Sequence, residues 1–276
     1  MSRFRFASTP AGAIGLGLLA VVLLVALAGP LFAAHPPAQS IGLPFDGPGH
    51  GTILGTDALG RDALSRTLWG GRSVLGLAGT ATLIAYLAGA TIGLVAGYLQ
   101  GPVDGLVMRG VDVLVSVPAL LFILVLVTGA GTSNGTLVVA VAVVQAPLIA
   151  RVVRSATLEQ SVRAFVEAAV ARGERAGAII YREIVPNIVP SVMADAGLRL
   201  TYSIILVASV NFFGLGLQPP AADWALMISE NRNGFDLNPW VIIAPAAMIA
   251  LLTIAVNLIG DAVARSLGRS DVRSDA

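Results

Sequence analysis

The sequence predicts an all-α integral membrane protein with six transmembrane helices, and three observations support this fold class. Apolar residues make up 56% of the 276 residues and charged residues only 12%, whereas soluble domains usually carry roughly 25% charge. The mean hydropathy is +0.84. Six apolar runs approach the length of about 20 residues that a bilayer span needs. Little of the chain remains for a soluble catalytic domain.

The first apolar run covers residues 11–33 and follows a short basic tip that contains Arg3 and Arg5. A signal peptide has an apolar region of about 7–15 residues, so this longer run indicates an uncleaved anchor. Residues 1–33 are therefore expected to form a cytoplasmic tip and the first membrane anchor. Residues 34–72 are expected to form an extracytoplasmic loop.

Five further apolar runs predict the remaining spans, at residues 74–98, 107–129, 136–153, 192–213 and 241–264. Residues 73–264 thus form the membrane core and residues 265–276 a tail. An even number of spans places both ends of the chain on the same side. Arginine is the only strong cation in the chain, and cytoplasmic loops should hold most of it. With both ends in the cytoplasm, only four of the 17 arginines fall outside: Arg61, Arg66, Arg72 and Arg232.

Glycine recurs every fourth residue in the second span, at Gly89, Gly93 and Gly97. This spacing places the three glycines on one helix face, where another helix backbone can approach closely. We expect that face to pack within the subunit rather than against a partner. Proline predicts kinks in or near three later spans, at Pro118, Pro147 and Pro245.

A polar, arginine-rich segment, residues 151–190, interrupts the apolar chain between spans four and five. Residues 161–172 predict a short helix that Gly173 can end, because glycine adopts the left-handed conformation without a Cβ clash. Residues 174–185 predict a second short helix. Proline at 186 and 190 is expected to mark its end and the entry to span five.

The first of these short helices carries small residues beside a charge. Ala168 and Ala169 leave room for the helix to sit deep in a groove, and Glu167 offers a charged contact at the rim. A helix held in a groove transmits rigid-body motion. The alternative is an ordinary positively charged cytoplasmic loop.

Six residues in this segment follow the spacing E-A-A-x3-G-x10-I-x-P: Glu167, Ala168, Ala169, Gly173, Ile184 and Pro186. This spacing, between two spans, resembles the cytoplasmic EAA loop of the permease subunits of ABC importers, here residues 155–190. The resemblance implies a type I ABC importer permease fold with short cytoplasmic coupling helices between spans four and five. It also implies that the six residues couple the chain to a partner ATPase.

Four further stretches resemble one subfamily, the dipeptide, oligopeptide and nickel permeases of the second-subunit type. They are LGTDALGRDALSR at 54–66, the entry to span three at 103–118, GLGLQPP with Trp224 at 214–224, and NLIGD at 257–261. The resemblance implies import of dipeptides or oligopeptides by alternating access in a prokaryotic inner membrane. Import of nickel chelates or another small solute by the same machinery is the alternative.

The same resemblance implies the partners of the chain. They are a second, related permease subunit, two ABC ATPase subunits and an extracytoplasmic substrate-binding protein, all working in membrane lipid and without nucleic acid. ATP and magnesium would be used by the ATPase subunits, and no cofactor is expected on this chain.

The residues present argue against an enzyme. The phosphate-binding loop of ATPases needs a lysine, and the chain has none. Cysteine is absent, and His35 and His50 lack the paired spacing of a zinc peptidase, so no metal site is expected. The rival class is an ATP-independent secondary transporter. Such proteins usually show internal repeats and buried ionisable groups near the midplane, and neither is clear here.

The motif before span two contains Gly55, Thr56, Asp57, Gly60, Arg61 and Asp62. Its glycines permit tight turns and its charges can pair locally, so a structural outer cap competes with direct contact to a binding protein. We expect a cap that also docks the partner. The later outer turn, Gln218, Pro219, Pro220 and Trp224, is expected to be rigid, with substrate contact as the alternative.

The chain departs from the subfamily in span five, where Asp195 and Arg199 lie four residues apart and the family usually has uncharged residues. The two can pair along one helix face. Since charge within a membrane tends to face the bundle interior or water, the pair could shape the substrate path. The alternative is a structural pair at the cytoplasmic boundary. Asp112 and Asp261, near span ends, are expected to pair structurally rather than to couple ions.

Overall fold

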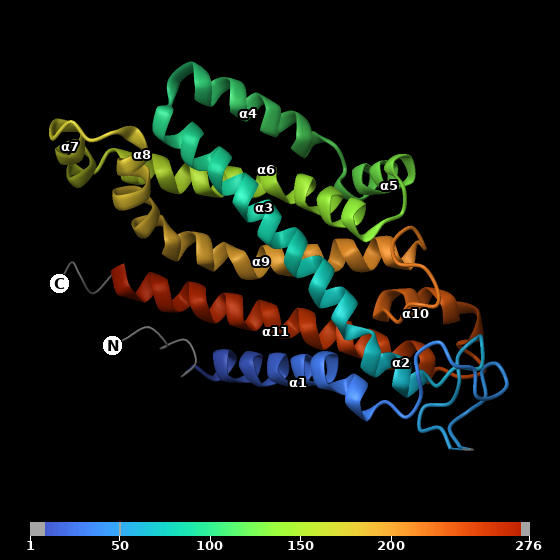
Figure 1. Ribbon diagram of the computed structural model, residues 1–276. Helices are drawn as coiled ribbons and strands as arrows, with labels where there is room; N and C mark the ends of the chain where they lie inside the picture. The colour runs from blue at the N-terminus through green and yellow to red at the C-terminus, as the bar shows by residue number, and fades with distance from the viewer. Residues whose placement is uncertain (1–8, 50, 272–276) are drawn as a thin grey trace.

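The computed structural model describes residues 9–49 and 51–271, with side chains as far as residue 266. The first eight residues of the predicted tip and residues 272–276 of the predicted tail lie outside the described residues. Long helices run side by side in an elongated bundle (Figure 1). Within the described residues the β structure is limited to three isolated bridges in the segment between residues 40 and 62.

Five helices are long and apolar enough to cross a membrane. They are built on α1 (Pro10–Phe32), α3 (Gly71–Leu99), α6 (Asn134–Ser161), α9 (Val185–Phe212) and α11 (Trp240–Asp271). In the described part of the chain, α1 begins and α11 ends at the same end of the bundle (Figure 1). The structure thus supports five of the six predicted spans and places the start of α1 and the end of α11 on one side.

The third span is broken, which corrects the prediction of one helix over residues 107–129. It consists of α4 (Gly101–Ser116) and α5 (Ala119–Ala130), bent by 86°. Pro118 has no N–H to continue the helix, and it disfavours the helical conformation at Val117, whose ψ is 130°. The kink expected at Pro118 is confirmed, and the bent pair brings the number of spans to six. Pro147 and Pro245, in contrast, lie inside uninterrupted helices.

Helices α3 and α6 pack closely along the glycine face. A Cβ added at Gly89 would lie 2.5 Å from the carbonyl oxygen of Ala146, and one at Gly93 would lie 2.6 Å from that of Ala150. Separations below 3.0 Å are not tolerated by real side chains, so only glycine allows this approach. The prediction that the glycine face packs within the subunit is confirmed.

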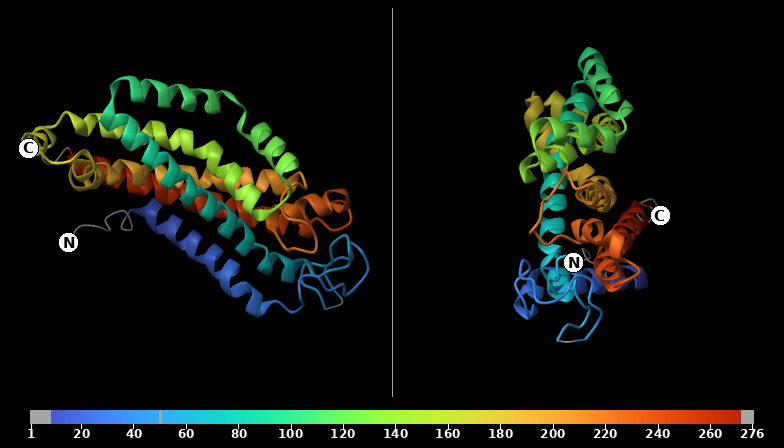
Figure 2. Two further views of the ribbon diagram at one scale, coloured as in Figure 1. Left: turned by 45° about the horizontal axis from the view of Figure 1, so that its top comes forward. Right: turned by 90° about the vertical axis from the view of Figure 1, so that its right-hand side faces the viewer.

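Two short helices fold at the end of the bundle opposite α7 (Ala164–Ala171). Helix α2 (Ala63–Trp69) directly precedes α3, and α10 (Trp224–Asn231) lies between α9 and α11. Figure 2 shows both beside the irregular segment that follows α1. The region 34–72, expected to be a loop, therefore ends in a helix, because Asp62 caps α2 by accepting from the backbone N–H groups of Leu64 and Ser65. We call this end, residues 33–70 and 213–239, the cap.

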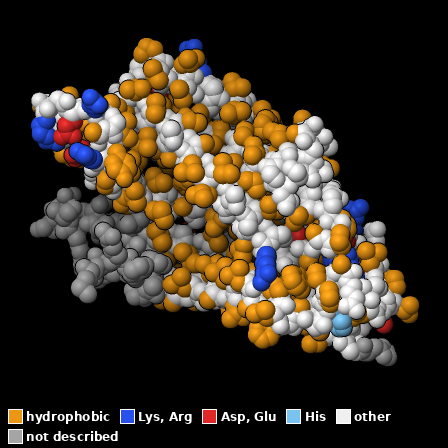
Figure 3. All heavy atoms as spheres, viewed as in Figure 1, with side chains coloured by type: hydrophobic (Ala, Val, Ile, Leu, Met, Phe, Trp, Pro, Cys, Tyr) orange, Lys and Arg blue, Asp and Glu red, His pale blue; other side chains and the backbone are white. Residues whose placement is uncertain are grey.

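The outer surface of the bundle is apolar, as Figure 3 shows on one face. Large side chains in the middle of spans are exposed, for example Leu24 at 62%, Leu83 at 60% and Val125 at 72%. Charged side chains gather instead at the tip formed by α7 and around the cap (Figure 3). An apolar girdle between two polar ends is the surface that a bilayer requires.

Candidate functional site

At the end opposite the cap, the chain between α6 and α9 forms a compact helical elbow together with the first turn of α9, residues 162–188. It contains α7 (Ala164–Ala171), α8 (Ala176–Ile179) and one π-helical turn, Ile180–Ile184. Figure 1 shows it projecting from the bundle. The first predicted helix is present, but the second does not end at Pro186 or Pro190. It runs through the π turn into α9, and Pro186 lies in the first turn of α9.

Gly173 ends α7 in the way the sequence predicts. Its φ is +76°, a conformation that strains any residue with a Cβ. The N–H of Gly173 donates to the carbonyl of Val170 at 2.9 Å, and the N–H of Glu174 donates to that of Ala169 at 3.2 Å. This pair of bonds is the Schellman motif, which satisfies the last carbonyls of the helix. The turn fixes the direction in which the chain leaves α7.

One face of the elbow is anchored in the bundle. Val166, Ala169 and Ile184 are 2%, 0% and 0% exposed, and they share an apolar cluster with Ile149 and Val153 of α6. Ala169, predicted to help seat the helix in a partner's groove, therefore packs inward. Because interiors are close-packed and resist deformation, this contact makes the elbow rigid relative to the spans.

The opposite face of α7 is open. Glu167, Ala168 and Val170 are exposed, and the side chain of Glu167 forms no hydrogen bond or ion pair with any described residue. The side chain of Arg172 forms an ion pair with Glu174, at 2.7 Å. Pro186 is also exposed. The structure therefore brings Ala169 and Ile184 together as the internal support of the elbow, while Gly173 forms the exposed turn after α7 and Glu167 and Ala168 lie on the outer face.

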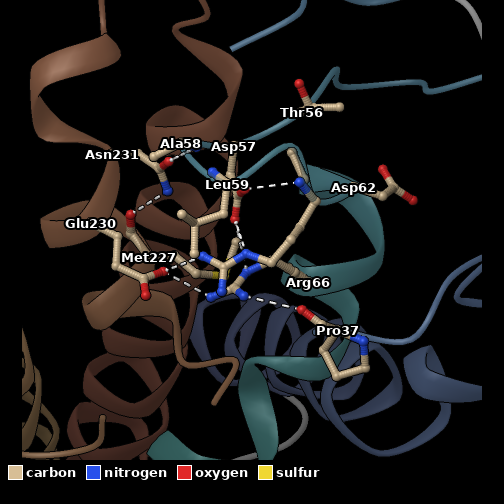
Figure 4. A network of polar contacts seen from close by, with 12 residues as sticks. Pro37, Thr56, Asp57, Ala58, Leu59, Asp62, Arg66, Met227, Glu230 and Asn231 are labelled. Carbon is tan, nitrogen blue, oxygen red and sulfur yellow. Dashed lines mark hydrogen bonds and ion pairs between the residues drawn. The ribbon is translucent and has the colours of Figure 1, made fainter. Parts of the chain in front are cut away.

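The cap is built on a buried cluster of charges (Figure 4). Arg61 lies 2.7 Å from Asp57 and 2.9 Å from Glu230, and Arg66 lies 3.3 Å from Asp57 and 2.9 Å from Glu230. Both arginines and Asp57 have side chains at most 3% exposed. Two cations and two carboxylates thus join the motif before span two to α10. Glu230 was not among the predicted residues. It lies 164 residues from Arg66 in the sequence, and no local pattern indicates that the two side chains pair.

Two buried asparagines complete the cap. Asn231 accepts from the backbone N–H of Ala58 at 2.9 Å, and Asn238 donates to the carbonyls of Leu54 and Thr56 at 3.0 and 3.3 Å. Gly55 and Gly60 have φ values of +75° and +71°. The structure brings Gly55, Thr56, Asp57, Gly60, Arg61 and Asp62 together in one internal network, in which the four non-glycine side chains are nearly fully buried.

The later outer turn is joined to α2 through Trp224, while Gln218, Pro219 and Pro220 are exposed. Trp224 is fully buried, and its indole N–H donates to the carbonyl of Thr67 at 2.8 Å. The Pro219–Pro220 peptide bond is cis, and the amide of Gln218 donates to the carbonyl of Gly214 at 2.8 Å. Trp224 was predicted as part of an outer turn, and it instead fixes α10 against α2.

The charged pair in span five forms as its spacing predicts. Arg199 Nε lies 3.0 Å from Asp195 Oδ2, and the Tyr86 hydroxyl of α3 donates to the same oxygen at 3.0 Å. Both charged side chains are at most 13% exposed. Gln145 of α6 donates to the carbonyl of Arg199 at 2.8 Å. Three helices therefore meet at this polar site. Elsewhere, Asp112 pairs with Arg151 at 2.5 Å.

A bundle of membrane spans, with a rigid elbow displayed at one end and a folded polar cap at the other, defines a transport permease. Within the described residues, no cluster of three His, Cys, Asp or Glu could hold a metal ion. The chain belongs to the family of binding-protein-dependent transport system inner membrane components, whose model matches residues 89–270. It is thus a multi-pass inner-membrane permease subunit of an ABC importer.

Named relatives agree with this assignment. The chain is 38% identical to the glutathione transport system permease protein GsiD of Pectobacterium atrosepticum, over 80% of this chain and 74% of the relative. It is 31% identical to the dipeptide transport system permease protein DppC of Alkalihalophilus pseudofirmus, over 92% and 84%. It is 35% identical to the oligopeptide transport system permease protein OppC of Haemophilus influenzae, over 79% and 70%.

The fold matches a solved structure of the inward-facing MetNI methionine ABC transporter. The TM-score is 0.59 at 17% identity, and the match covers 73% of this chain and 96% of the other. The expectation of a type I ABC importer permease fold is confirmed.

Proposed function

We propose that this permease moves peptides into the cytoplasm by alternating access and that the elbow receives the motion of partner ATPases. The elbow end then lies in the cytoplasm, together with both ends of the chain. The arginines of the elbow support this orientation, since cytoplasmic loops are rich in arginine: they are Arg163, Arg172, Arg175 and Arg182.

The observation that carries the docking role is the division of α7 into two faces. Val166 and Ala169 fix the helix to α6, while Glu167 and Ala168 face outward without a partner. A helix in this position can enter a groove on an ATPase and transmit its movement to α9, because the chain is helical from Ala176 into α9.

Partners supply the parts that this chain lacks. Two ATPase subunits would use ATP and magnesium, since the chain has no lysine for a phosphate-binding loop. A second, related permease subunit would complete the path. An extracytoplasmic binding protein would deliver substrate to the cap, whose motif residues support it from within rather than touch the partner.

Peptides are the proposed substrates. The relatives are named for dipeptide, oligopeptide and glutathione transport, and these three compounds share amide bonds together with free amino and carboxyl groups. Competition between a labelled dipeptide and unlabelled peptides or nickel chelates for uptake would test this assignment. Stronger competition by a nickel chelate than by any peptide would contradict it.

A charge reversal tests the docking role. We expect Glu167→Arg to fold normally but to lose most substrate uptake, because one lost charge-assisted hydrogen bond costs about 1.5–3 kcal/mol, a factor of roughly 10–100. Substrate-stimulated ATP hydrolysis by the assembled transporter should fall in parallel. The matched control is Glu159→Arg. Glu159 is an exposed acid of α6 whose side chain pairs only with Arg163, at 3.2 Å. Normal uptake by Glu167→Arg, or equal losses in both variants, would refute the role of Glu167.

The pair in span five is proposed to be structural, because Tyr86 and Gln145 hold it between three helices. We expect the double variant Asp195→Ala, Arg199→Ala to lower thermal stability while the order of preference among transported peptides stays the same. Measurements of unfolding temperature and of competition between labelled peptides would check both parts. A changed order of preference would show that the pair helps to shape the substrate path.

A further inference from the structure

The break between α4 and α5 leaves backbone groups open at membrane depth. We infer that this break, together with the α4 face formed by Arg109, Asp112 and Ser116, lines a water-filled passage and does not face lipid. The inference rests on the proposed transport function, because a passage has no other use in this chain.

The length of α4 places the break inside the bilayer. The helix begins at Gly101, directly after the tight turn that ends α3. Its 16 residues span about 24 Å at about 1.5 Å per residue. The hydrocarbon layer is about 30 Å thick. Whether α4 starts at the membrane surface or somewhat outside it, its far end at Ser116 lies within that layer.

Polar backbone groups are unpaired on both sides of the break. Helix α5 has no side-chain cap, and its first backbone donation is from Phe122 to the carbonyl of Pro118 at 3.0 Å. Within the described residues, the N–H groups of Ala119, Leu120 and Leu121 therefore lack partners. On the α4 side, Ser116 donates to the carbonyl of Val113 at 2.7 Å. The carbonyls of the residues between Val113 and Val117 have no such partner.

Lipid cannot satisfy these groups. Each unpaired N–H or C=O in hydrocarbon costs several kcal/mol, so broken helices at membrane depth occur only in protein or beside water. Ser116, Val117 and Pro118 are all exposed on this subunit, so its own side chains do not cover the break.

A second feature of α4 points to water independently. The Asp112–Arg151 pair is 62% and 44% exposed, although Asp112 lies well inside the helix. Arg109, one turn earlier, is exposed and pairs with no described residue. Arg109, Asp112 and Ser116 share one face of α4, because residues three and four apart are neighbours on a helix. Charged groups in membrane spans face the bundle interior or water.

Water explains this face better than a dry contact with another subunit. No described residue of this chain supplies an anion to Arg109, so a dry contact would bury this charge uncompensated from its own side, which is strongly destabilising. A wet face hydrates Arg109, the ion pair and the open backbone groups together. The passage therefore runs along α4 and past the break.

The chain has no cysteine, which makes single-cysteine labelling direct. Ser116→Cys and Val117→Cys probe the break, Leu24→Cys probes an exposed position in the unbroken helix α1, and Ile53→Cys, 72% exposed in the cap, probes open water. Each variant is assembled with its partner subunits in native membrane vesicles. It is then treated from both sides with a charged, membrane-impermeant methanethiosulfonate, and its rate of labelling is measured by mass spectrometry.

We expect the cysteines at 116 and 117 to label at a rate close to that at 53. The cysteine at 24 should react about 100-fold more slowly, because only the thiolate reacts and hydrocarbon keeps the thiol protonated. Labelling of both break positions as slow as at position 24 would overturn the inference. Substrate uptake is measured separately. If uptake needs ATP but the cysteines at 116 and 117 are not labelled, the passage is rejected and the proposed function stands. If uptake proceeds without ATP, the proposed function itself is rejected.

Discussion

At the residue scale, single buried groups hold the cap together, and Glu230 is the clearest case. It accepts from both Arg61 and Arg66 at 2.9 Å. Glu230→Gln would leave two buried guanidinium groups with one carboxylate between them. Breaking a buried ion pair costs about 3–5 kcal/mol, and we expect the unfolding temperature of the purified permease to fall by about 6–20 °C.

A control isolates the effect of the Glu230 cluster. Asp236 is exposed and lies near the same helix, so Asp236→Asn should leave the unfolding temperature almost unchanged. Equal unfolding temperatures for Glu230→Gln and the unaltered chain would show that the cluster does not stabilise the cap.

Asp223 makes the stability of the cap depend on pH. It is fully buried at the start of α10, where it accepts from the N–H groups of Ala225 and Leu226 and from the Ser73 hydroxyl. Burial raises the pKa of this carboxyl above its ordinary value, and these hydrogen bonds oppose the rise only in part. The folded protein then binds the proton more tightly than the unfolded chain. The stabilising contribution of Asp223 is therefore complete when the pH is below the pKa that this carboxyl has in the unfolded chain. It is lost as the pH rises through the pKa that the carboxyl has in the folded protein.

Asp223→Asn removes this titration while it keeps the oxygen that caps α10. We expect the variant to gain stability relative to the unaltered chain as pH rises from about 4 toward neutrality. Thermal unfolding of both proteins across this range checks the prediction. A difference in unfolding temperature that stays constant with pH would contradict it.

At the element scale, the contact between α3 and α6 depends on glycine. Gly93→Ala would place a Cβ within 3 Å of Ala150 and Val153, and such overpacking typically costs about 1–3 kcal/mol. Gly79→Ala in the same helix meets no atom within 4 Å, so it should be neutral or stabilising by up to about 1 kcal/mol. Unfolding temperatures of the two variants give the comparison. A Gly93→Ala variant as stable as Gly79→Ala would mean that the helices can separate freely.

The sequence was most informative about elements whose cause is local. Gly173 ends α7 because its conformation is set by its own lack of a side chain, and apolar length alone located five spans. The 86° break at Pro118 was expected only as a kink, since the size of a bend depends on how α5 packs against α6. The continuation of the helix past Pro186 was missed, because a proline in the first turn of a helix resembles one that follows its end.

Long-range partners were the least predictable part of the site. The spacing of Asp195 and Arg199 indicated their pairing, but nothing in the sequence indicated that Tyr86 of α3 would donate to it. In the same way, the charges of the motif at 54–66 suggested local pairs. Their common partner Glu230 lies on α10, and only folding brings it to them.

At the scale of the whole molecule, the subunit has the features of one half of a membrane passage. Its spans carry an apolar girdle, its elbow is rigid on one face and open on the other, and the broken third span exposes polar groups. These features need partners on the elbow and across the passage. The chain therefore works as one subunit of an ATP-driven assembly.

This assembly can be tested by gentle extraction of the tagged chain from its native membrane, followed by native mass spectrometry of the proteins that accompany it. We expect one copy of this chain, one related six-span permease and two ATPase subunits. Recovery of this chain alone or only with copies of itself, active in transport without ATP, would exclude such an assembly and favour a secondary transporter.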